Sequence, residues 1–74
     1  MPSVVVTGRA FFEPARAVEA FRDHLGVGRA EAQSLAEAIA AGREIRLPVV
    51  SAESAHALSV ALRDAGADAE PMAE

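Results

Sequence analysis

Cysteine and lysine are among the residue types that this chain of 74 residues lacks, since its seven Lys/Arg positions are all arginine. Without cysteine there is no disulfide framework, thiol chemistry or cysteine-ligated zinc. Without lysine there is neither a Schiff-base amine nor a P-loop lysine. Because the two histidines are also unpaired, we expect no cofactor and no metal site. We also expect no catalytic residues, since the polar residues do not supply a reactive pocket.

Long apolar runs and excess positive charge are also lacking. No run approaches the roughly 18–20 residues that cross a bilayer, and no basic segment precedes an apolar one at the N-terminus. The formal net charge is −4, which opposes a general affinity for phosphate backbones. We expect a cytoplasmic protein whose partner is neither a nucleic acid nor a membrane.

The first third of the chain predicts a strand followed by a helix. Residues 3–7 are mostly β-branched and read as a strand buried on much of both faces. Pro14 suits the first position of a helix, and Gly26 suits its end, which predicts a helix over about residues 14–25. Its apolar stripe recurs at helical spacing: Ala17, Val18, Phe21 and Leu25.

The remainder predicts helix, strand, helix and strand. A second helix begins at Arg29, carries a stripe of Ala32, Leu35, Ala36 and Ile39, and ends before Gly42. Residues 44–50 alternate as a half-buried strand that faces an edge at Pro48. Ser51 is a good N-cap for a third helix, whose stripe is Ala55, Leu58, Leu62 and Ala65 and which ends at Gly66. Residues 67–72, with Pro71, suggest a short, blunted edge strand.

A Gly-x-Gly at residues 26–28 has two interpretations. It could cradle a phosphate at a helix N-terminus, or it could be an elbow between two helices. A dinucleotide fingerprint needs a strand before the glycines and a third glycine, whereas here a helix precedes them and Glu31 stands at the third position. The pattern favours the elbow.

The order of elements and the glycine elbows resemble a known fold. "LGVGRAEAQSLAEA" followed by "VSAESAHALSVALRDAGADAE" resembles the C-terminal domain of the bacterial large-subunit ribosomal stalk protein over residues 14–70. The adaptor of the Clp protease that binds N-terminal degrons shares this fold, and residues 4–26 align with it without a gap. The resemblance implies one α+β domain over residues 1–74. It implies a two-layer sandwich, β-α-α-β-α-β, with a three-stranded antiparallel sheet covered by three helices.

Neither family's activity is expected to carry over. Stalk proteins contact translational GTPases through basic residues on their first two helices, and this chain has Pro14, Glu19 and Gln33 where the family has Lys. Of the matching contact positions, only Arg22 keeps its charge and Val18 its apolar character. Charge reversal at Glu19 would replace attraction by repulsion.

The degron adaptor holds the free amino group of its client with an asparagine and acidic residues after the first strand. The chain has Gly8, Arg9 and Ala10 at those positions. A buried ammonium needs acceptors, and Arg9 would repel it. We therefore expect no binding of peptides by their N-terminal residue.

The other polar residues suggest little chemistry. His24 and His56 lie on different predicted helices, and neither has a second ligand four residues further along the chain. Ser51 is explained as a cap, and no nucleophile elbow surrounds any serine. The structural interpretation is preferred for all of them.

The pair Phe11-Phe12 is more informative, because it contains two of the three aromatic residues in the chain. Both rings could plug one end of the sandwich. Alternatively, one ring is buried and its neighbour is an exposed anchor for a partner, as aromatic residues at interfaces often are. Val60 is a weaker candidate of the same kind, since it lies away from the third apolar stripe.

The sequence as a whole predicts a small non-catalytic protein-binding module, acting as an adaptor, an inhibitor or an accessory subunit of a larger protein machine. One alternative is a structural subunit that self-associates through an edge strand or the Phe11-Phe12 loop; another is a divergent stalk-like protein associated with translation. The chain should be a monomer or a weak homo-oligomer that contacts an unidentified protein partner. The predicted contact residues are Arg9, Phe11, Phe12, Val18 and Arg22.

Overall fold

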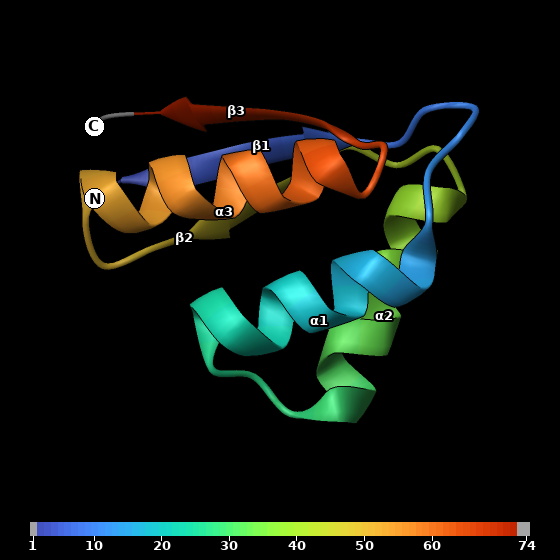
Figure 1. Ribbon diagram of the computed structural model, residues 1–74, viewed down its shortest axis with the longest axis horizontal. Helices are drawn as coiled ribbons and strands as arrows, with labels where there is room; N and C mark the ends of the chain where they lie inside the picture. Colours follow the sequence, from blue (N-terminus) through green and yellow to red (C-terminus); the bar gives the residue numbers. More distant parts are fainter. Residues whose placement is uncertain (1, 73–74) are drawn as a thin grey trace.

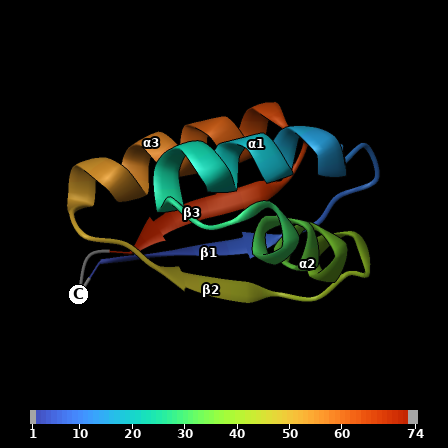
Figure 2. The ribbon, with the colours of Figure 1, turned by 90° about the horizontal axis from the view of Figure 1, so that it is seen from below.

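The structure is a computed structural model that describes residues 2–72, and it contains a single three-stranded sheet and three helices (Figure 1). The elements in chain order are β1 (Ser3–Thr7), α1 (Pro14–Leu25), α2 (Arg29–Ala40), β2 (Ile45–Pro48), α3 (Ala52–Asp64) and β3 (Asp68–Met72). The helices lie on one side of the sheet (Figure 2). The predicted α+β fold and the order β-α-α-β-α-β are confirmed.

The sheet has the strand order β2-β1-β3, and both pairings are antiparallel. The register places Val4 opposite Leu47 on one side and Pro71 on the other. The β-branched strand β1 is thus central, where its residues pack against neighbours on both sides.

The core lies between the sheet and the helices. Val4 and Val6 are fully buried, whereas Val5 and Thr7 are only half-buried. The prediction that β1 is buried on much of both faces is therefore corrected, because the helices cover only one face (Figure 2). The largest fully buried side chains are Phe21, Ile39, Leu58, Leu62, Val4 and Val6.

The predicted helix ends are confirmed. Gly26 adopts a left-handed conformation (φ 68°) immediately after α1, and Gly28 is extended (φ −72°, ψ 166°) immediately before α2. The Gly-x-Gly is therefore an elbow between two helices. At the start of α3, the Ser51 hydroxyl accepts a hydrogen bond from the backbone N–H of Ser54 at 3.1 Å. Ser51 is thus the N-cap that the sequence predicts.

The predicted strand 44–50 is longer than the observed β2. The alternation is correct, since Leu47 and Val49 are buried while Arg46 and Pro48 are exposed. The ladder ends because β1 begins at Ser3, opposite Pro48. Val49 still donates one hydrogen bond, to the Pro2 carbonyl at 2.9 Å, and the chain then turns outward at Val50, which is 85% exposed.

Candidate protein-contact surfaces

The loop between β1 and α1 is fixed by backbone hydrogen bonds. The Phe12 N–H donates to the Arg9 carbonyl at 3.1 Å and closes a turn over residues 9–12. The Glu13 N–H donates to the Ala65 carbonyl at 2.7 Å and ties this loop to the end of α3. The loop therefore has a defined conformation, because one hydrogen bond lies within it and another connects it to the end of α3.

Close packing against Gly66 adds a third restraint. A Cβ atom at Gly66 would lie 2.5 Å from the Phe11 carbonyl oxygen and 3.0 Å from the Phe12 Cα. Because atoms this close would clash, the turn can pack against the α3–β3 connection only if residue 66 is a glycine. Sequence analysis predicted Gly66 as a helix end but missed this second role, which has no signal within its own segment.

The two phenylalanines of the loop have different environments. Phe12 packs against the hydrophobic core, whereas Phe11 is 89% exposed at the tip of the turn. The interpretation in which both rings plug the sandwich is therefore wrong. The structure agrees with the alternative in which one ring is buried more than its neighbour, and Phe11 is the exposed ring.

Charged side chains surround Phe11. Phe11 lines a hollow of about 410 Å³ together with Arg9, Arg63, Gly66, Ala67 and Asp68. Arg9 Nη2 lies 3.8 Å from Asp68 Oδ2, and the two side chains are 70% and 57% exposed. An exposed pair at this distance contributes little, so the Arg9 guanidinium can turn to another acceptor.

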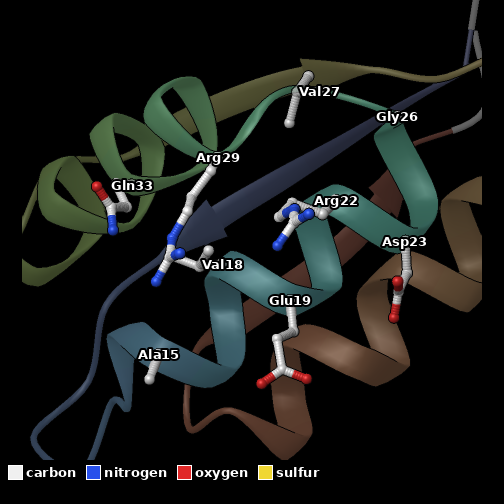
Figure 3. Close-up of a pocket in the computed structure, with 9 residues that line it drawn as sticks. All are labelled: Ala15, Val18, Glu19, Arg22, Asp23, Gly26, Val27, Arg29 and Gln33. Atoms are coloured by element: carbon white, nitrogen blue, oxygen red, sulfur yellow. The ribbon is translucent and has the colours of Figure 1, made fainter.

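Val18 and Arg22 lie on a second surface, in a groove of about 630 Å³ between α1 and α2 (Figure 3). Arg29 extends from the start of α2 towards Val18, and Arg22 points into the same space (Figure 3). The groove is lined by Ala15, Val18, Glu19, Arg22, Asp23, Gly26, Val27, Arg29 and Gln33. Its charged side chains are two carboxylates and two guanidiniums, so its formal charge is zero.

The predicted contact residues therefore divide into two groups. Arg9 and Phe11 lie together at the loop, and Phe12 lies beneath them as part of the packing. Val18 and Arg22 lie in the groove instead, which is a separate set of lining residues. Sequence analysis missed Arg63, Val27 and Arg29, because their proximity to these sites depends on tertiary packing.

The two surfaces described above include neither Ser59 nor the two histidines. Ser59 is buried, and its hydroxyl donates to the Ala55 carbonyl at 2.8 Å. His24 and His56 are exposed on α1 and α3. Within residues 2–72, His, Asp and Glu side chains form no group of three that could hold a metal ion. None of the helices in this range has the length and apolar character needed to cross a membrane.

Comparison with known proteins adds no relative: the chain matches no protein-family model and no curated protein sequence. The similarity to the stalk and adaptor families stays a prediction from the sequence pattern. The function is therefore inferred from the hollow at Phe11 and the groove between α1 and α2.

Proposed function

We propose that the protein is a small non-catalytic protein-binding module and that Phe11 is its principal contact residue. The observation that carries this proposal is the 89% exposure of a phenylalanine in a chain with only three aromatic residues. A large exposed ring loses stabilisation that burial would supply, and aromatic residues are frequent anchors at protein interfaces.

The loop geometry supports the same proposal. The turn that carries Phe11 is held by the Phe12–Arg9 and Glu13–Ala65 hydrogen bonds and by the contact with Gly66. A residue presented by a rigid loop loses little conformational freedom on binding, so more of its contact energy contributes to affinity. A rigid loop is therefore better suited than a mobile loop to carry an anchor residue.

The surroundings of Phe11 suggest the chemistry of the partner. Arg9 and Arg63 line the same hollow as Phe11, and Arg is itself enriched at interfaces. A complementary partner has an apolar pocket for the ring and carboxylates on the rim that faces Arg9. In this proposal, the module acts in the cytoplasm as an adaptor, an inhibitor or an accessory subunit of a larger protein machine.

Affinity capture from a lysate of the source organism tests the proposal with three baits: wild type, Phe11→Ala and Val50→Ala. Val50 is the matched control, because it is also apolar and is 85% exposed. We expect wild type and Val50→Ala to retain the same specific protein and Phe11→Ala to lose it. Retention of that protein by Phe11→Ala, or its absence from all three baits, contradicts the proposal.

A further inference from the structure

The two edges of the sheet are protected to different degrees. At the β3 edge, Arg63 Nε donates to the Ala69 carbonyl at 2.9 Å, so this carbonyl points away from β1. Two residues further on, the backbone of Pro71 also faces away from β1, and proline has no N–H that could donate to another strand. The outward carbonyl of Ala69 is therefore occupied, and the outward donor at position 71 is missing because proline has no N–H, which is a common way of blocking an edge strand.

The β2 edge also has an outward-facing proline, Pro48, but this residue lies at the end of the strand and the centre of the edge is open. Val49 donates to the Pro2 carbonyl, so the odd-numbered residues of this segment direct their backbone groups towards β1. The backbone N–H and C=O of Arg46 alternate with them and therefore point away from β1, towards the open edge. Within residues 2–72, no backbone hydrogen bond from a turn or loop reaches Arg46. Its N–H and C=O can thus pair with another strand.

The side chains beside this open edge carry opposite charges. Arg46 lies opposite Val5 on the sheet face that the helices leave uncovered, and it is exposed. Glu44 is also exposed and lines a hollow on that same face with Val5 and Thr7. An acid and a base therefore lie two positions apart on one face of the edge segment.

We propose that two copies of the chain pair antiparallel through β2, with Ile45 of one copy opposite Ile45 of the other. In this register, Glu44 of each copy lies directly opposite Arg46 of the second copy, so that two ion pairs form across the new ladder. Opposite charges at directly paired positions favour strand association. The result is one continuous sheet with β2 at its centre.

Neighbouring registers are less favourable for reasons of charge and hydrogen bonding. A pairing centred on Arg46 places this residue opposite itself, with like charges in contact. A pairing centred on Leu47 places Arg46 opposite Pro48, which lacks an N–H and removes a ladder bond. In the register centred on Ile45, Pro48 lies opposite Gly42, beyond the strand. Charge and proline therefore select the same arrangement.

This inference is independent of the function proposed for Phe11. The hollow around Phe11 is lined by residues of the α3–β3 connection. This connection leads into β3, which forms the opposite edge of the sheet from β2. A dimer formed through β2 leaves Phe11 free, and a protein bound at Phe11 leaves the β2 edge free. Either proposal can fail without the other.

Sedimentation equilibrium from about 10 μM to about 1 mM, a range suited to weak association, tests the pairing. We expect wild type to dimerise, and Glu44→Arg and Arg46→Glu each to weaken the dimer by about tenfold or more, because attraction becomes repulsion at two positions. The double variant Glu44→Arg/Arg46→Glu should restore it. Glu70→Arg makes the same charge change on the same face at β3 and should leave the dimer unchanged.

Each variant must first give a thermal transition like that of wild type, which the exposure of Glu44 and Arg46 favours. A wild-type chain that is monomeric over the whole range overturns the proposal. A dimer that tolerates both single variants also overturns it, because pairing then takes place elsewhere. Failure of the double variant to recover association excludes the register centred on Ile45.

Discussion

The backbone of Phe11 lies directly against Gly66, so that a Cβ on this glycine would stand 2.5 Å from the Phe11 carbonyl oxygen. Gly66 also has a positive φ of 89°. One glycine thus performs two tasks, because it ends the last helix and leaves room for the turn that presents the exposed ring. The stability of the fold and the position of the proposed contact residue are coupled at this point.

The first prediction separates these two tasks of Gly66. Gly66→Ala should lower the free energy of unfolding by about 2–4 kcal/mol, because an alanine is strained at positive φ and also meets the Phe11 backbone. Gly42→Ala is the control, since Gly42 has a similar φ of 86° but nothing within 4 Å of an added Cβ. It should cost only about 1 kcal/mol. Urea unfolding measures both values, and equal losses would show that the close contact is unimportant.

The second prediction concerns the two rings of the loop. Phe12→Ala should lower the free energy of unfolding by about 1–3 kcal/mol, because Phe12 packs against the core. In a domain of this size, each kcal/mol corresponds to about 4–8 °C in Tm. Phe11→Ala should leave the Tm nearly unchanged, because its ring is exposed. Thermal unfolding followed by circular dichroism distinguishes the two, and a similar loss in both variants contradicts the assignment of Phe11 as a surface residue.

Local patterns in the sequence were sufficient to predict most of the fold. The stripe around Phe21, the cap at Ser51 and the glycine after each helix are signals within a few residues, and each element appears where it is predicted. The strand ending near Val50 was overestimated, because its length depends on where its partner β1 begins. Strand pairing is a tertiary property, and the alternation of apolar and polar residues within one segment does not show where its partner strand begins.

The candidate site was predictable only in part. The sequence leaves open whether both rings of the Phe11-Phe12 pair are buried. Their environments depend on tertiary packing, which includes the contact of the loop backbone with Gly66, more than fifty residues away in the chain. The division of the predicted contact residues between the loop and the groove also follows from packing. Arg22 and Arg9 carry the same charge, and nothing in the sequence places them on separate surfaces.

The third prediction tests the cap of α3. Ser51→Ala should lower the free energy of unfolding by about 1 kcal/mol, because the Ser54 N–H loses its acceptor. Ser34→Ala is the matched control, since Ser34 is exposed within α2, where alanine is the better helix former. Chemical denaturation of the two variants measures the difference. A loss at Ser34 that equals the loss at Ser51 contradicts a capping role.

The fourth prediction concerns the groove between α1 and α2. Glu19 and Gln33 line it, at positions that the predicted resemblance matches to Lys in the stalk family, and its formal charge is balanced. We expect no micromolar binding of a bacterial elongation GTPase in fluorescence anisotropy. Arg9 in the β1–α1 loop should likewise prevent binding of peptides with a bulky N-terminal residue. Micromolar affinity for either ligand would contradict the expectation that neither activity is present.

The most direct test of the central claim is the affinity of the captured partner for wild type and Phe11→Ala, measured by calorimetry with the purified proteins. The account predicts a Kd at least about tenfold weaker for Phe11→Ala, as expected for loss of an interface anchor, with its Tm unchanged. Val50→Ala should bind like wild type. Equal affinity of Phe11→Ala and wild type, or a loss of binding that appears only together with a loss of Tm, would contradict the assignment of Phe11 as the contact residue.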